Sequence, residues 1–471
     1  MRALLAALLL ASSTSVLPAA PAAAAAADPH ALALAAGYKA AFLCSGIFNA
    51  GQSEAQVTAD DLNGVYPEVQ PLLADLSAVV DRDAHRVSVT FDAALPPRIA
   101  VWRPLLGCAQ LPVGSTNADV VPRLTPDFQR PDLAAMDAAP WPLGDRDATA
   151  KLPRRSARAL DAVIADAFTT KFGGRNGEAP SSTAVIILKN GRIIAERYRA
   201  GYDLHTPQRT WSVAKSLTAT LVGRAAQLGR IDVAAPAPIP EWQRPGDPRA
   251  AITTAQLLQM NSGLWTAGPG NRTDEVYLGG ASVAQTAAAM PIARAPGSHF
   301  NYSNNDIMLA AYAVETRLGA EALGFPFTQL LWPLGMTRTT PETDWQGHFI
   351  LSSQVWTTAR DMARLALLYQ NDGMANGQRL LPPGWRDYVS TPHGTQPMPA
   401  TPGRGGYGAG FWLFGARDGL PDGSYAMVGN RGQYAIIVPS RQLVIVRRGF
   451  DAGGAAFDPL AFAKAVLAAV E

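Results

Sequence analysis

The alternation of apolar and polar positions divides the chain into four stretches, and the first is residues 1–27. It has one Arg, an apolar run from Ala3 to Ala11, and a tract of small residues that ends near Ala27. A charged start, a short apolar core and small residues at the end are typical of a secretory signal peptide. We therefore expect this stretch to be removed and the mature protein to be periplasmic or secreted.

Beyond residue 27 the sequence predicts no membrane anchor. By inspection, no later apolar run reaches the roughly 20 residues that a transmembrane helix needs. The segment "AFLC", which ends at Cys44, also lacks the small residue that precedes a lipid-modified cysteine. We expect a soluble exported protein.

The second stretch, residues 28–113, has the pattern of a small α+β module. A helical pattern runs from His30 to about Phe42. Apolar residues alternate with polar ones at Val87, Val89 and Phe91, and a second apolar strand follows around Arg98 to Leu106. The function of this module is not evident from its residues.

The chain has two cysteines, Cys44 and Cys108, and both belong to this module. In an oxidising compartment an even number of cysteines predicts a disulfide first. Two buried free thiols are the alternative, because cysteine is among the most buried residue types. A zinc site is disfavoured, since no His accompanies the pair at ligand spacing.

The third stretch, residues 114–155, is rich in Pro and Asp and has weak periodicity. Such composition predicts a linker that lies on the surface of the domain after it.

The fourth stretch, residues 156–471, predicts one antiparallel sheet interrupted by a helical insertion. An amphipathic helix over about Ala157–Phe168 precedes "TAVIILKNGRIIAERY", where Asn190-Gly191 predicts a tight hairpin turn. Helical and loop patterns fill residues 212 to about 385, strands return in "YAIIVPSRQLVIVRRG", and a helix closes the chain over Asp458–Val470. The fold class is therefore α+β, with terminal helices flanking the sheet.

Charge and histidine spacing exclude several classes of function. Lys plus Arg number 40 against 38 for Asp plus Glu, so the chain has no excess charge for binding nucleic acid. The six His form no His-Glu-x-x-His pair, and His205 and His299, which lie near the candidate motifs, are expected to be satisfied polar residues. Phosphate and dinucleotide motifs are missing from the sequence, so we expect no cofactor and no metal.

The stretch "RTWSVAKSLTATLVGRAAQLG" contains the candidate nucleophile. Ser212 and Lys215 are three residues apart at a predicted helix start, so they share one face. A neutral lysine can remove the proton of the serine hydroxyl, and burial favours the neutral form. The alternative is that Ser212 caps the helix and Lys215 is solvated. The apolar flanks favour a buried helix and the catalytic interpretation.

A third group is expected in "PGSHFNYSN", where Tyr302 could relay protons and Asn304 could orient the lysine. Tyr369 and Asn371 repeat this spacing. They end an amphipathic run, however, in which a core tyrosine and a helix-ending asparagine are ordinary. The Pro-Gly turn before Tyr302 favours the first pair.

These residues resemble a known family, the penicillin-recognising serine hydrolases. Within it they resemble the class C β-lactamase-like branch with its esterases, D-amino-acid peptidases and 6-aminohexanoate-dimer hydrolases, and they lie nearest the 6-aminohexanoate-dimer hydrolases and esterases. The resemblance extends over about Leu160–Glu471. It implies a β-lactamase/transpeptidase-like fold, with Ser212 as acylated nucleophile, Lys215 as base and Tyr302 as proton relay. It also implies an oxyanion site formed by the backbone N–H groups of Ser212 and Asn430. The matching segments occur in family order: "WSVAKS", "ITTAQLLQMNSGL", "PGSHFNYSN", "WPLGM", "VWTTARDMARLALLYQNDG" and "GNRGQYAIIVP".

One position departs from the family. Where the family often has Lys-Thr-Gly or His-Thr-Gly, this chain has Met427-Val428-Gly429. Gly429 still permits close approach of a substrate, but the cation that helps to hold a substrate carboxylate is missing. Arg431 is the candidate to replace that cation.

The sequence therefore predicts a hydrolase that acts through an acyl-enzyme on a small ester or amide. A cell-wall D-amino-acid peptidase or β-lactamase is the alternative, and a catalytically silent binding protein of the same fold is the third hypothesis. The substrate depends on loops such as 271–280 and 402–407, and the sequence determines neither the substrate nor the oligomeric state.

Overall fold

The structure is a computed structural model that describes residues 28–125, 128–174, 179–266, 274–397, 405–452 and 456–470. The predicted signal peptide lies outside the described residues, as do parts of both substrate loops, residues 271–273 and 402–404.

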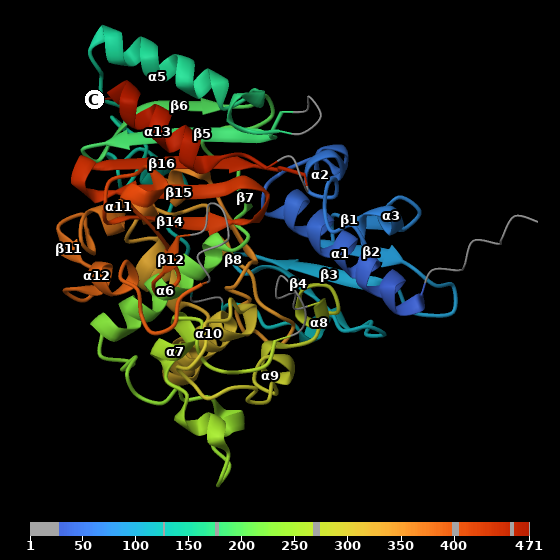
Figure 1. Ribbon diagram of the computed structural model, residues 1–471. Coiled ribbons are helices and arrows are strands. Elements are labelled where there is room, and N and C mark those ends of the chain that lie inside the picture. The colour runs from blue at the N-terminus through green and yellow to red at the C-terminus, as the bar shows by residue number, and fades with distance from the viewer. Residues whose placement is uncertain are drawn as a thin grey trace, which may run out of the picture.

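The main sheet has seven antiparallel strands in the order β12-β13-β14-β15-β16-β5-β6 (Figure 1). Its two halves come from opposite ends of the domain, because β16 pairs with β5. The strand bounds are Gly406–Tyr407 for β12, Trp412–Phe414 for β13, Ser424–Gly429 for β14, Gln433–Val438 for β15, Leu443–Gly449 for β16, Ser182–Lys189 for β5 and Arg192–Tyr198 for β6.

The hairpin that joins β5 to β6 turns at Asn190-Gly191, as predicted. Both residues have positive φ, 50° and 75°, which is the conformation a type I′ turn requires.

Helices cover the two faces of this sheet, and neighbouring residues of β16 show which helices lie on each. Arg447 donates to Ser182 and lies over the ring of Phe457, which precedes the C-terminal helix α13 (Pro459–Val470). Arg448 donates to the carbonyl of Thr357, just before α11 (Ala359–Gln370). Successive strand residues point to opposite faces. Helix α13, which packs on α5 (Arg154–Asp166), and helix α11 therefore cover opposite faces.

The predicted helical insertion is present between β6 and β12, and its central helix is α6 (Val213–Gln227). Thirteen of the 15 residues of α6 are buried, as expected of a helix enclosed on all sides. The other helices are α7 (Thr254–Leu258), α8 (Asp274–Tyr277), α9 (Val283–Thr286), α10 (Asn304–Leu318) and α12 (Trp385–Val389). Short strands accompany them: β7 (Gln208–Arg209), β8 (Thr340–Pro341), β9 (Val355–Thr357), β10 (Met374–Ala375) and β11 (Gln378–Arg379).

The N-terminal module (residues 28–113) packs one long helix on a four-stranded antiparallel sheet, beside the larger domain of residues 156–471 (Figure 1). The predicted disulfide is present and joins Cys44 of the long helix to Cys108 of the last strand. The elements are α1 (Pro29–Phe48), α2 (Glu54–Asp60), α3 (Gln70–Leu73), β1 (Ser77–Asp81), β2 (Arg86–Thr90), β3 (Arg98–Arg103) and β4 (Gly107–Gln110). The sequence pattern missed β1, whose apolar residues are half-buried (Ala78, Val80) or exposed (Val79), and it merged the end of β3 with the turn into β4.

Helix α1 corrects one expectation from the sequence. It has 20 residues and a mean hydropathy of 1.6, so by length and composition it is able to cross a membrane. The expectation that no apolar run after residue 27 is this long was wrong. The helix contains many alanines, and its average stays apolar although Lys39 interrupts it. In the fold 67% of its apolar window is buried against the module, which is how the core helix of a globular module behaves.

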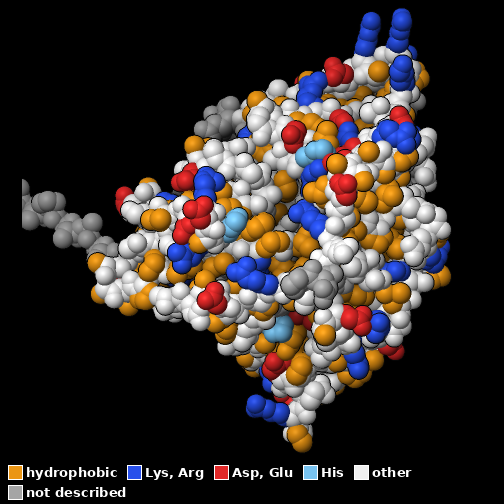
Figure 2. Space-filling model, turned by 180° about the vertical axis from the view of Figure 1, so that it is seen from behind, with side chains coloured by type: hydrophobic (Ala, Val, Ile, Leu, Met, Phe, Trp, Pro, Cys, Tyr) orange, Lys and Arg blue, Asp and Glu red, His pale blue; other side chains and the backbone are white. Residues whose placement is uncertain are grey.

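Charges of both signs are interspersed on the rear face of the molecule (Figure 2). On this face Lys and Arg side chains alternate with Asp and Glu. The distribution agrees with the formal net charge of +2.

Candidate active site

Ser212 lies directly before α6, between that helix and β7. Its hydroxyl makes no capping hydrogen bond with the described residues, so the interpretation of Ser212 as a simple helix cap is not supported. The residue before it, Trp211, has a φ of 50°. A positive φ is unusual for a bulky residue and marks a backbone that its surroundings must hold. The chain thus presents Ser212 from a constrained turn.

Lys215 lies one helical turn further on, and its ammonium nitrogen contacts three oxygen atoms. Nζ is 3.1 Å from Ser212 Oγ, 2.6 Å from Asn304 Oδ1 and 2.8 Å from the carbonyl oxygen of Ser352. The side chain is 1% exposed. The structure therefore brings three of the predicted site residues into one cluster.

The pKa of Lys215 is lowered to about 7. Burial is the main cause, because it disfavours the charged form, and the positive charge of Arg209 adds to it. A lysine with this pKa is about half neutral at pH 7, which is the state in which it can accept a proton.

The contacts of the amine also fix where its lone pair points. A neutral amine has two N–H donors and one lone pair. The oxygens of Asn304 and Ser352 are acceptors only, so they take the two N–H groups. The remaining direction faces the hydroxyl of Ser212. In its neutral form Lys215 is arranged to accept the hydroxyl proton.

Tyr302 lies beside this cluster, just before α10. Its ring centroid is 5.0 Å from Lys215 Nζ. The rings of Tyr407 and Trp412, from β12 and β13, lie 6.0 and 5.5 Å from it. The sheet and the insertion together hold the phenol next to the lysine.

Tyr369, the residue at the competing spacing, is in the core. It is fully buried on α11, and its hydroxyl lies 2.9 Å from Thr220 Oγ1. Its ring packs against Phe411 at 4.6 Å. The contacts are those of a structural tyrosine.

Gly429 ends β14 against the backbone of the nucleophile. A Cβ at this position would lie 2.3 Å from the carbonyl oxygen of Thr210 and 3.2 Å from the backbone nitrogen of Ser212. Such distances exclude any side chain. Asn430 follows directly at the exposed end of the strand. The backbone nitrogens of Ser212 and Asn430 thus belong to segments that meet at Gly429.

Met427 is completely buried on the same strand. The expected substitute cation, Arg431, is engaged elsewhere, so that expectation was wrong. Its guanidinium donates to the carbonyl oxygens of Asp60 and Asp61 at 2.9 and 3.0 Å, and also to that of Asn63. Arg431 fastens the N-terminal module to the end of β14.

Sequence reasoning missed two contributors to the cluster. The carbonyl of Ser352 comes from 137 residues away and carries no side-chain signal. Arg209 stands three residues before Ser212 at the start of the same motif. This closeness in sequence was the signal that could have predicted a cation near Lys215. Its guanidinium donates to Ser353 Oγ at 2.7 Å and lies 4.1 Å from the ring centroid of Trp211.

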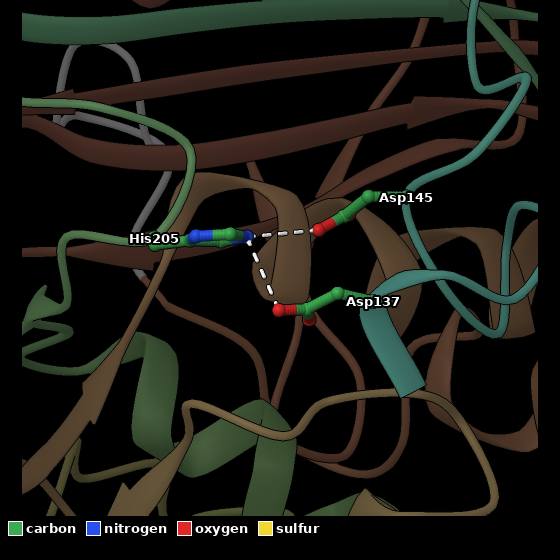
Figure 3. A group of neighbouring side chains, drawn as sticks. All are labelled: Asp137, Asp145 and His205. Atoms are coloured by element: carbon green, nitrogen blue, oxygen red, sulfur yellow. Dashed lines mark hydrogen bonds and ion pairs between the residues drawn. The ribbon is translucent and has the colours of Figure 1, made fainter. Parts of the chain in front are cut away.

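A second polar cluster joins Asp137, Asp145 and His205, three groups of the kind that ligate metals. Figure 3 shows both carboxylates pointing toward the imidazole. His205 Nε2 lies 3.0 Å from Asp145 Oδ2 and 3.9 Å from Asp137 Oδ2. His205 is thus a hydrogen-bonded polar residue.

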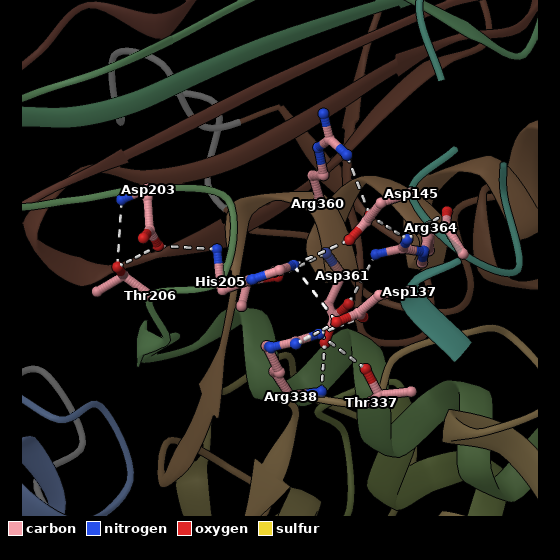
Figure 4. A network of polar contacts seen from close by, with 12 residues as sticks. Asp137, Asp145, Asp203, His205, Thr206, Thr337, Arg338, Arg360, Asp361 and Arg364 are labelled. Carbon is pink, nitrogen blue, oxygen red and sulfur yellow. Dashed lines mark hydrogen bonds and ion pairs between the residues drawn. The ribbon is translucent and has the colours of Figure 1, made fainter. Parts of the chain in front are cut away.

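Arginines surround these carboxylates (Figure 4). Arg338 contacts both oxygens of Asp137 at 2.7 and 2.6 Å. Asp145 Oδ1 accepts from Arg364 at 2.8 Å and from Arg360 at 3.1 Å. Burial alone would raise the pKa of Asp145, but the hydrogen bonds from His205 and the arginines lower it to about 2. We interpret the cluster as an ion-pair network that fastens residues 137–145 to the domain.

Comparison with known proteins identifies the family. The model of the β-lactamase family matches residues 175–447, which is more than half of the chain. The chain belongs to the β-lactamase family.

Individual relatives agree with this assignment. A 6-aminohexanoate-dimer hydrolase from Paenarthrobacter ureafaciens is 27% identical over 331 residues, or 65% of this chain and 83% of the relative. A class C β-lactamase structure is 16% identical, with a TM-score of 0.52 over 67% of this chain and 96% of its own. A family VIII carboxylesterase is 17% identical, with a TM-score of 0.52 over 68% and 98%. The two structures establish the β-lactamase/transpeptidase-like fold.

Proposed function

We propose that this member of the β-lactamase family is a serine hydrolase that forms an acyl-enzyme on Ser212 from a small ester or amide. One observation carries the proposal. Lys215 lies 3.1 Å from the Ser212 hydroxyl with its N–H groups directed to other acceptors and its pKa lowered to about 7.

The reaction follows from this geometry. Lys215 accepts the hydroxyl proton while Ser212 Oγ attacks the substrate carbonyl, and the negative charge on the carbonyl oxygen is bound by the N–H groups of Ser212 and Asn430. Tyr302 passes the proton to the leaving alcohol or amine as the carbonyl re-forms. Water then attacks the acyl-enzyme by the reverse of these proton transfers and releases the acid.

Two features argue against capture of a substrate carboxylate at the strand beside the nucleophile. Met427 places an apolar side chain on the strand beside the nucleophile, and Arg431 is committed to the N-terminal module. A carboxylate bound there would lose charge-assisted hydrogen bonds worth about 1.5–3 kcal/mol each. The relative at 27% identity is named for hydrolysis of the 6-aminohexanoate dimer, which supports testing amides beside esters.

We further propose that the enzyme works outside the cytoplasm on small molecules, without nucleic acid and without a membrane anchor. The disulfide between Cys44 and Cys108 supports an oxidising compartment. The sequence of residues 1–27, with one Arg, an apolar run and a tract of small residues, agrees with export.

A side-by-side assay tests the function. We expect p-nitrophenyl butyrate and short amides to be hydrolysed with a higher kcat/KM than nitrocefin, and a fluorophosphonate probe to label Ser212. Ser212→Ala should lose both signals, whereas Ser216→Ala, one turn along the same helix, should keep them. A preference for nitrocefin or for D-Ala-D-Ala peptides would favour the β-lactamase or peptidase alternative. No labelling and no turnover would favour a silent binding protein.

A further inference from the structure

The N-terminal module reaches the residues that flank the nucleophile. The Phe42 ring of α1 lies 6.0 Å from the ring of Trp211, and Tyr66 lies edge-on to the same ring at 6.3 Å. Trp211 is the residue with positive φ that directly precedes Ser212. Two aromatic side chains from outside the larger domain therefore contact the turn that presents the hydroxyl.

Arg209 lies between the two parts of the molecule. Its guanidinium carbon is 4.6 Å from the ring centroid of Phe42 and 4.1 Å from that of Trp211. Contacts of a cation with an aromatic face are strongest when water is excluded. The same guanidinium donates to Ser353, next to the residue whose carbonyl accepts from Lys215. Phe42, Arg209 and Trp211 thus form one stack between the module and the nucleophile turn. The hydrogen bond from Arg209 to Ser353 connects this stack to the segment that binds Lys215.

The module is fixed firmly enough to act on this turn. Glu342, which follows β8, accepts hydrogen bonds from Ser45 Oγ, Asn49 Nδ2 and the backbone N–H of Cys108, at 2.6, 2.8 and 3.0 Å. Arg431 fastens the Asp60 to Asn63 loop on the other side. The two attachments lie near β7 and β14, the strands whose ends carry the nucleophile and the proposed oxyanion site.

We propose that the N-terminal module is a positioning part of the active site, in which Phe42 and Tyr66 enclose Arg209 and Trp211 and so hold Ser212 within reach of Lys215. The inference rests on the proposed serine hydrolase function. A bulky residue in the left-handed region is strained and persists there only while its surroundings hold it. Displacing the hydroxyl by about 1 Å can cost a hundredfold in rate.

The stack also affects the charge near Lys215. Arg209 helps to lower the pKa of Lys215, and its effect grows when water is kept away from the guanidinium. Opening the stack should therefore let the pKa of Lys215 rise. Other titratable and charged groups face this pair from the elements around it: Tyr38, Asp61, Tyr66, Tyr277, Tyr302, Glu342 and Arg448.

The test compares alanine variants of the enclosing rings in the full-length protein. Phe42→Ala and Tyr66→Ala should lower kcat for p-nitrophenyl butyrate 10- to 100-fold, change KM less than threefold, and slow fluorophosphonate labelling to the same extent. In Phe42→Ala the acid limb of kcat/KM should move to higher pH. Tyr66→Phe keeps the ring and should restore most of the rate.

Phe48→Ala is the matched control, because Phe48 lies on the same helix but packs on Trp102 and His85 within the module. It should lower the melting temperature without moving the pH profile. Wild-type kcat, labelling rate and pH profile in both alanine variants would overturn the proposal, as would an equal loss in Phe48→Ala. A wild-type protein that neither turns over nor labels would instead refute the proposed function. Tyr66 is only half-buried, so Tyr66→Ala keeps the test decisive if Phe42→Ala does not fold.

Discussion

Lys215 donates a 2.6 Å hydrogen bond to the side-chain oxygen of Asn304. The amide accepts this hydrogen bond without carrying charge, so it orients the amine and leaves its lowered pKa intact. An ionised carboxylate in the same place would stabilise the ammonium form. The choice of Asn at position 304 therefore bears directly on the protonation of the proposed base.

Asn304→Asp should shift the pH dependence of the reaction upward. Lys215 has a pKa near 7, so it is protonated and unable to act as a base below that pH and neutral above it. For a neutral ester, wild-type kcat/KM should rise through about pH 7. The added carboxylate should move this acid limb up by one or more pH units and reduce the rate at pH 7 at least tenfold. Asn301→Asp, at an exposed position three residues earlier, should leave the profile in place. If the acid limb of the kcat/KM pH profile were unchanged in Asn304→Asp, a group other than Lys215 would control the rate.

Tyr302→Phe and Tyr369→Phe should separate catalysis from stability. Loss of the phenol at position 302 should reduce kcat 100-fold or more, the usual contribution of acid–base catalysis. Loss of the Tyr369 hydroxyl removes its contact with Thr220 and should cost about 1 kcal/mol of unfolding free energy, with kcat within threefold of wild type. Steady-state kinetics and chemical denaturation check the pair. The reverse pattern would make Tyr369 the functional residue.

Met427→Lys should change the selectivity between substrates. It restores a cation on the strand beside the nucleophile, where a substrate carboxylate would gain a charge-assisted hydrogen bond. We expect the ratio of kcat/KM for nitrocefin to that for p-nitrophenyl butyrate to increase ten- to a hundredfold. Val428→Lys adds the same charge at the next position of β14, which points to the other face, and should not change the ratio. Efficient nitrocefin turnover by the wild type would contradict the role given to Met427.

Replacing both Cys44 and Cys108 by Ala should destabilise the module. The bridge closes a loop between residues 64 positions apart, which corresponds to about 4 kcal/mol on the chain-entropy model. Thermal unfolding of the double variant should begin at a lower temperature than in the wild type, and reductant should lower only the wild-type value. Intact mass should change by two hydrogens when the wild type is reduced. A melting temperature that responds to neither treatment would argue against a stabilising disulfide.

Features local in sequence were predictable, and features that depend on distant segments were not. Asn190-Gly191 fixed the hairpin, and the three-residue spacing of Ser212 and Lys215 placed both on one face of a helix. The carbonyl of Ser352 gave no signal, because a backbone acceptor has no residue type. The role of Arg431 as a substitute cation was predicted wrongly. Nothing in the sequence around it shows that the loop after α2 lies beside it and binds its guanidinium.

The pairing of β16 with β5 determines when this protein can complete its fold. Residues 443–449 form a ladder with residues 182–189, so β5 has an open edge until residue 449 has been synthesised. An unpaired apolar edge is a template for pairing with other chains. Removal of β16 (Leu443–Gly449) would therefore divide the sheet between β15 and β5 and leave an open edge on each side of the gap.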